Sequence, residues 1–148
     1  MTRSEYIASI CARRDQAVQV PFVEVSPDGW TPEIAGCHPN VDRWVKENPG
    51  CEAVRGWITY LVFGPAGVQL TAHSVVRDER GSLFDITPVK EGQPRGGAFV
   101  EHQGDPALFC KMKDHDIRCP SLDPAADAEA LREVIGEADF GADNEAEE

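Results

Sequence analysis

Three residues in the first two thirds of this chain have side chains and positions suited to nucleophilic chemistry. Cys37 opens a segment with helical spacing, His73 lies in a run of β-forming residues, and Asp85 lies in the next such run. The free N–H groups and the macrodipole at a helix N-terminus favour a thiolate and lower the thiol pKa. A thiolate nucleophile needs an adjacent base, and the base needs an acceptor that orients it. The pattern therefore predicts a thiol nucleophile, a histidine base and an orienting carboxylate.

A β-hairpin predicted over residues 72–88 brings the histidine and the carboxylate together. The turn is Asp78-Glu-Arg-Gly81, in which the glycine can adopt a positive φ and close a three-residue loop. With that loop, His73 and Asp85 have the same parity, so their side chains leave the same face within about 5–8 Å at Cβ. A two-residue loop would turn Asp85 to the other face, so the pairing depends on the turn.

The cysteine begins a predicted helix over residues 37–50. Pro39 suits the first helical turn, and Asn48-Pro49-Gly50 ends the helix. One stripe of its surface is apolar or small and should be buried, at Cys37, Val41, Trp44, Val45 and Asn48. The segments 55–63, 68–77 and 82–87 that follow predict a three-stranded antiparallel meander.

This constellation resembles the papain-like superfamily, especially its transglutaminase, arylamine acetyltransferase and NlpC/P60-like branches. The matching residues are Gly36-Cys37 before a helix, His73 in AHSVV and Asp85 in FDITP, so the resemblance covers residues 36–88. It implies thiol-dependent acyl chemistry, in which Cys37 attacks an amide, ester or thioester carbonyl. His73 would then accept and return the proton while Asp85 orients it. Hydrolysis, deamidation and acyl transfer all remain open, because they share a thioester intermediate.

The donors of an oxyanion hole are less clear in the sequence. The backbone N–H of Cys37 is one candidate, and the Asn40 amide or His38 is a second. Gln19 is the nearest upstream glutamine. His38 adjoins the cysteine, but neighbours on a helix do not face each other, so His73 is the predicted base.

The remaining segments complete a predicted α+β fold. An amphipathic helix is expected over residues 3–18, a short strand over 20–25, another over 98–102 and a final helix over 125–138. We expect the Cys-bearing helix to pack on an antiparallel sheet of four or five strands, with helices at both ends of the chain. Residues 1–140 should form one domain, and the acidic residues 141–148 a disordered, dispensable tail.

The five cysteines are an odd number without regular spacing, which argues against a disulfide framework and for a reducing, cytoplasmic location. Cys11 lies on the apolar stripe of the first helix and is expected to fill the core as a thiol. Cys110, His115 and Cys119 form part of a zinc-site pattern, with His102 as a conceivable fourth ligand. A zinc-stabilised binding domain is therefore one alternative function, although no cofactor is expected for the thiol chemistry.

Charge limits the possible partners. The net charge is −12, and residues 123–148 alone carry ten acidic residues and one arginine. No region offers the basic surface that nucleic acid needs, and no apolar run approaches the ~20 residues that span a membrane. The expected substrate is a peptide, a protein or a small acyl compound, with a mild preference for a cationic one. A non-catalytic interaction module on the same fold is the second alternative, and the oligomeric state is not predicted.

Overall fold

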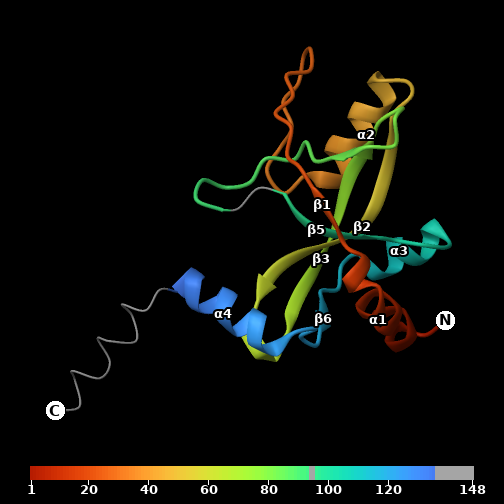
Figure 1. Cartoon of the computed structure of the whole chain (residues 1–148). Helices are drawn as coiled ribbons and strands as arrows, with labels where there is room; N and C mark the ends of the chain where they lie inside the picture. Colours follow the sequence, from red (N-terminus) through yellow and green to blue (C-terminus); the bar gives the residue numbers. More distant parts are fainter. Residues whose placement is uncertain (94–95, 136–148) are drawn as a thin grey trace.

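The computed structural model describes residues 1–93 and 96–135, in which four α-helices surround an antiparallel sheet (Figure 1). The helices are α1 (Arg3–Ala12), α2 (Cys37–Glu47), α3 (Pro106–Met112) and α4 (Pro124–Ile135), with 3₁₀ turns at Arg14–Gln16 and Gly64–Ala66. The strands are β1 (Val18–Val20), β2 (Glu52–Val62), β3 (Val68–Arg77), β4 (Leu83–Phe84), β5 (Gly97–Glu101) and β6 (Ile117–Cys119). The predicted tail, residues 141–148, and the end of the predicted last helix lie outside the described residues.

The sheet confirms the predicted α+β class and the three-stranded meander. Its order is β1-β5-β2-β3-β4, and the long strands β2 and β3 form its centre. β6 was not predicted, and it pairs with β3 near Val68–Leu70. Gly56 on β2 lies opposite His73, and a Cβ at this glycine would meet the Val100 carbonyl oxygen at 2.3 Å. No larger residue fits at this point of the sheet.

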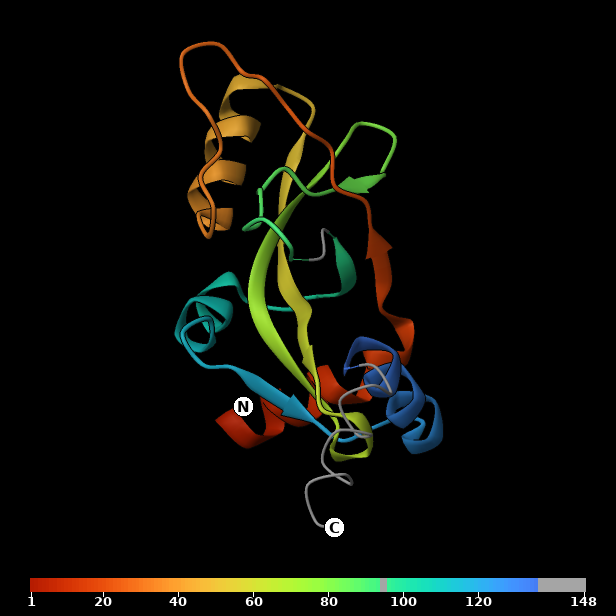
Figure 2. The same cartoon turned by 90° about the vertical axis from the view of Figure 1, so that its left-hand side faces the viewer.

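The two ends of this sheet are joined by backbone hydrogen bonds. Beyond β4, the N–H of Asp85 donates to the Pro21 carbonyl at 2.9 Å, and the N–H of Val23 donates to the Asp85 carbonyl at 2.8 Å. The segment after β1 therefore closes against the segment after β4, and the sheet curls around an interior (Figure 2). Five strands fill that interior with apolar side chains, from Val20, Val54, Ile58, Val75, Leu83 and Phe99.

One edge of β3 is only partly paired by the strands. β2 runs along one edge, whereas the other edge pairs with β6 at residues 68–70 and with β4 at residues 76–77. Among the described residues, no strand therefore pairs with residues 71–75 on that edge. Successive side chains alternate between faces, so His73 shares the inner face with Val75, and Ser74 shares the outer face with Val76.

Helix α2 packs on the outer face of the sheet beside this open edge. Val41 is fully buried in a cluster with Val76 and Ile86, which fixes the helix on β3. The helix ends before Pro49, and Gly50 takes a φ of +97°, which a glycine adopts without strain. Its N-terminal end points to the middle of the molecule and its C-terminal end to one extremity (Figure 2).

Helix α1 is shorter than predicted, and the expectation that Cys11 is an unpaired core thiol is wrong. The helix starts at a capping box formed by Thr2 and Glu5 and ends at Ala12. Cys11 forms a disulfide with Cys119 on β6, 108 positions away in sequence. The argument from cysteine number failed because only the tertiary packing of α1 against β6 brings these two residues together.

Within residues 1–93 and 96–135, no helix combines the length and the apolar character that crossing a membrane requires.

Candidate functional site

The hairpin that positions His73 and Asp85 has the predicted three-residue loop. The N–H of Asp78 donates to the Ser82 carbonyl at 2.9 Å, and Gly81 takes a φ of +84°. Val76 lies opposite Phe84, which places Asp85 opposite Val75 and one diagonal from His73. The Nε2 atom of His73 lies 2.6 Å from Oδ2 of Asp85. The sequence prediction of a same-face histidine–carboxylate pair is confirmed.

Asp85 is fixed on several sides. Its other carboxylate oxygen accepts the backbone N–H of Thr87 at 2.9 Å, and its backbone bonds to Pro21 and Val23. The residue is 4% exposed. A buried carboxylate with this support can hold the imidazole of His73 in one orientation and stabilise its protonated form.

The Cys37 thiol lies at the start of α2, close enough to His38 and His73 for both imidazoles to lower its pKa. Since Nε2 of His73 is bonded to Asp85, its Nδ1 is the atom left for the thiol. Burial by itself raises the thiol pKa, but the interactions of the thiol with His38 and His73 outweigh it and lower the pKa of Cys37 to about 6.

The pKa of His73 is shifted in the opposite direction. Burial by itself lowers its pKa, but the hydrogen bonds to Asp85 and Cys37 and their negative charges raise the pKa of His73 to about 9. Between about pH 6 and 9 the pair therefore exists as thiolate and imidazolium. This is the charge state that a thiol nucleophile requires.

His38 contacts the thiol, contrary to the expectation that a helix neighbour would point away. Its Nδ1 lies 2.5 Å from Oγ of Ser74, which is on the outer face of β3, whereas His73 is on the inner face. Residues of the first turn of α2 thus reach both faces of β3 across its open edge. The helical-neighbour rule failed because the thiol lies at the end of the helix, where side chains of the first turn can converge on one point.

Asn40 and Gln19 do not have the surroundings expected of oxyanion donors. The amide nitrogen of Asn40 donates to the Glu33 carbonyl at 2.8 Å and to Oγ1 of Thr87 at 3.2 Å, which uses both of its hydrogens. Asn40 therefore ties the approach to α2 to the segment after β4. Gln19 is an exposed residue of β1 opposite Ala98, and nothing described joins it to Cys37.

The alternative zinc site of Cys110, His115 and Cys119 is not assembled by the described residues. Cys119 is bonded to Cys11, so its sulfur is not a free thiolate. His102 accepts the Tyr6 hydroxyl at 2.8 Å on Nδ1 and donates from Nε2 to the Asp105 carbonyl at 2.9 Å, because the Tyr6 oxygen already accepts the Trp57 N–H. Cys110 and His115 are exposed. The residues in the described ranges include no group of three or more histidine, cysteine or acidic side chains placed to hold a metal ion.

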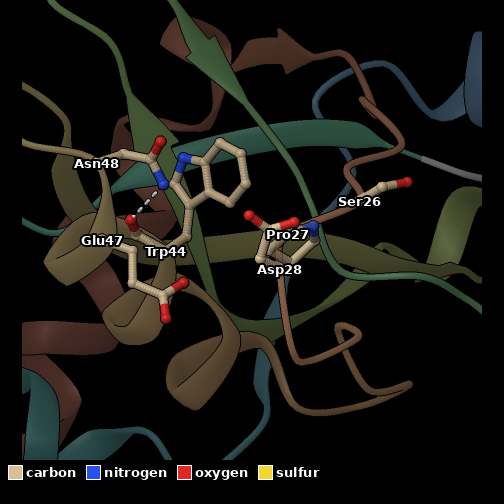
Figure 3. A pocket seen from close by; sticks show the side chains of 6 residues that line it. All are labelled: Ser26, Pro27, Asp28, Trp44, Glu47 and Asn48. Carbon is tan, nitrogen blue, oxygen red and sulfur yellow. Dashed lines mark hydrogen bonds between the residues drawn. The ribbon is translucent and has the colours of Figure 1, made fainter.

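Of the surface hollows described, two border α2, and Cys37 lines neither. The first lies between the 26–28 loop and the end of the helix, where the Trp44 ring lies between Asn48 and Asp28 (Figure 3). The second is lined by residues of α2 from Pro39 to Glu47. Cys37 and Glu47 are ten positions apart, or about 15 Å along the helix axis, so the first hollow is remote from the thiol.

No protein-family model, curated protein or solved structure matches this chain. The site must therefore be interpreted from its own residues.

Proposed function

We propose that this protein performs thiol-dependent acyl chemistry with Cys37 as nucleophile, His73 as acid and base, and Asp85 as the residue that orients His73. The observation that carries the proposal is the His73–Asp85 hydrogen bond beside a thiol at a helix N-terminus, and the opposite pKa shifts of Cys37 and His73 support it. The papain-like and transglutaminase-like resemblance of residues 36–88 belongs to the same proposal.

The proposed reaction balances with these three residues and one acceptor. The thiolate attacks the carbonyl carbon, a C–S bond forms, and the carbonyl becomes an oxyanion. His73 then donates its proton to the leaving nitrogen, oxygen or sulfur, and the bond to that atom breaks to give a thioester. Neutral His73 next takes a proton from water or another acceptor, which attacks the thioester, and the C–S bond breaks to restore the thiolate and the imidazolium.

The start of α2 supports a role for backbone donors at the oxyanion. Across residues 1–93 and 96–135, no side chain caps this helix, and Pro39 has no N–H. The N–H groups of Cys37 and His38 are therefore the first-turn donors nearest the sulfur. Both lie at the positive end of the helix dipole, where a developing negative charge is stabilised.

Alkylation tests the nucleophile directly. Iodoacetamide near pH 6.5, followed by peptide mass spectrometry, should label Cys37 before the free thiols Cys51 and Cys110, although Cys110 is the exposed one. His73→Ala should slow the labelling of Cys37 about threefold or more at this pH, because the pKa of Cys37 then rises by at least one unit. Asp85→Asn should give a smaller loss, because it keeps the imidazole.

The matched control is His115→Ala, which removes an exposed histidine. It should leave the labelling of Cys37 unchanged. Incubation with an activated acetate ester should then add one acetyl group to Cys37 in the native protein and not in His73→Ala. If Cys37 is no more reactive than Cys110, the enzyme proposal fails.

One observation favours the non-catalytic module as a second candidate. Cys37 is only 9% exposed and lines neither described hollow. On this alternative, the thiol and its histidines hold α2 on the sheet, and the ion pair is structural. An inert Cys37 in the folded protein, with normal reactivity after unfolding, is the result that supports it.

The cytoplasmic location expected from the sequence stays a proposal, and the Cys11–Cys119 disulfide argues against it. Disulfides persist in oxidising compartments and are rare where glutathione keeps thiols reduced. Blocking free thiols in intact cells before lysis reports the state of Cys11. A reduced Cys11 would support the cytoplasm, and an oxidised one would indicate an oxidising compartment.

A further inference from the structure

The second histidine at the thiol, His38, is held by a buried hydroxyl. Its Nδ1 lies 2.5 Å from Oγ of Ser74, a residue with no solvent exposure. The edge of its ring also packs on Phe109 of α3, at 5.8 Å between centroids. These contacts restrain the imidazole from the sheet and from α3.

The hydrogen-bond partners of Ser74 determine where the proton of His38 lies. Arg55 donates from Nη1 to the same Oγ at 2.7 Å, and an arginine can only donate. The hydroxyl hydrogen of Ser74 needs an acceptor in turn, because burial keeps water away. Within the described residues, the other partner of this oxygen is Nδ1 of His38. Ser74 therefore donates to Nδ1, which makes His38 the neutral tautomer with its hydrogen on Nε2.

Arg55 is itself held in place, and it fixes which group donates in each hydrogen bond from Arg55 through Ser74 to His38. Its Nη2 donates to Oδ1 of Asp42, one turn further along α2. The titratable partners of the thiol are His38 and His73. Asp85 bonds His73, and Arg55 and Asp42 lie behind His38.

We propose that His38 is a positioning residue that donates its Nε2–H to the Cys37 sulfur and stays neutral throughout the reaction, while His73 alone exchanges protons. This inference rests on the proposed function and assigns different tasks to the two histidines. When His73 gives its proton to the leaving group, its charge is lost. The donor on His38 does not change at that step, so the sulfur keeps one fixed hydrogen bond when it is released again as a thiolate.

Two substitutions at His38 separate a neutral donor from a charge. His38→Gln offers an amide N–H near the position of Nε2, whereas His38→Leu keeps bulk without a donor. The pH profile of Cys37 alkylation should be unchanged within about twofold in His38→Gln. In His38→Leu the inflection of this profile should move up by about one pH unit, which lowers the rate about fivefold near pH 6. Equal losses in both variants, or no change in His38→Leu, would overturn the proposal.

A measurement on the unmodified protein keeps the test independent of folding. Nitrogen-15 NMR of the histidine rings near pH 7.5 should show His38 protonated on Nε2 alone and His73 protonated on both nitrogens. A hydrogen on Nδ1 of His38 at this pH would contradict the proposal. The proposed function fails separately, if His73→Ala leaves the labelling of Cys37 unchanged.

Discussion

At the residue scale, folding moves one proton from the Cys37 thiol to the His73 imidazole. In the unfolded chain near neutral pH, the thiol of Cys37 carries the proton and the imidazole of His73 is mostly neutral. In the folded protein the imidazole carries it and the thiol does not. Asp85 drives this exchange because its buried carboxylate stabilises the imidazolium. Folding therefore activates the sulfur without binding or releasing a proton overall.

Because the pair binds the same number of protons in both states, we predict that its contribution to the free energy of unfolding is independent of pH near neutrality. The raised pKa of His73 stabilises the fold until the pH rises through about 9, and the lowered pKa of Cys37 does so until the pH falls through about 6. Between about pH 6.5 and 8.5 both states of the pair hold one proton, so the pair adds no slope. Urea unfolding should thus give a constant difference in unfolding free energy between the native protein and the double variant Cys37→Ser, His73→Ala, which lacks both groups of the pair, across this range. It should shrink below pH 6, and a steep slope near pH 7.5 would contradict the ion pair.

At the element scale, the hairpin turn was readable from the sequence, and the open edge of β3 was not. Asp78 and Gly81 specify the three-residue loop locally, which fixed the shared face of His73 and Asp85. The gap at residues 71–75 depends on β6, which comes about fifty residues later and was not predicted. The convergence of His38 and His73 on one thiol follows from that gap, so local patterns could not predict it.

The turn length gives a prediction at this scale. Deleting Arg80 should leave a two-residue loop and turn Asp85 to the outer face, because a shift of one residue reverses every side chain. His73 then loses its carboxylate, and alkylation of Cys37 near pH 6.5 should slow at least as much as in Asp85→Asn.

Gly81→Ala is the control for this deletion. It strains the positive φ at a cost of about 1–2 kcal/mol and leaves the register intact, because the space around this glycine is open. Its labelling of Cys37 should match that of the native protein. Equal labelling in the deletion variant and in Gly81→Ala would show that the loop does not set the pairing.

At the scale of the whole molecule, the sequence predicted the α+β class, the Cys-bearing helix and the meander, and it missed how the sheet closes. The closure depends on hydrogen bonds between Asp85 and the Pro21–Val23 segment, which are more than sixty residues apart. The Cys11–Cys119 pairing is non-local in the same way, because spacing and cysteine number carry no information about which distant segments pack together.

The disulfide gives the last prediction, which concerns the stability of the whole fold. It joins residues 108 positions apart, and the chain-entropy model assigns a cross-link of that span about 4–5 kcal/mol of stability. Urea unfolding should thus show a lower midpoint in dithiothreitol than without it. The double variant Cys11→Ala and Cys119→Ala should unfold near the reduced protein and be insensitive to the reductant. Cys37 lies on α2, and neither α1 nor β6 supplies a residue proposed for the site, so its alkylation near pH 6.5 should persist in the folded variant. If the oxidised and reduced proteins unfold at the same urea concentration, the disulfide does not stabilise the fold. If the double variant loses Cys37 reactivity while it is folded, the disulfide between α1 and β6 also positions the site.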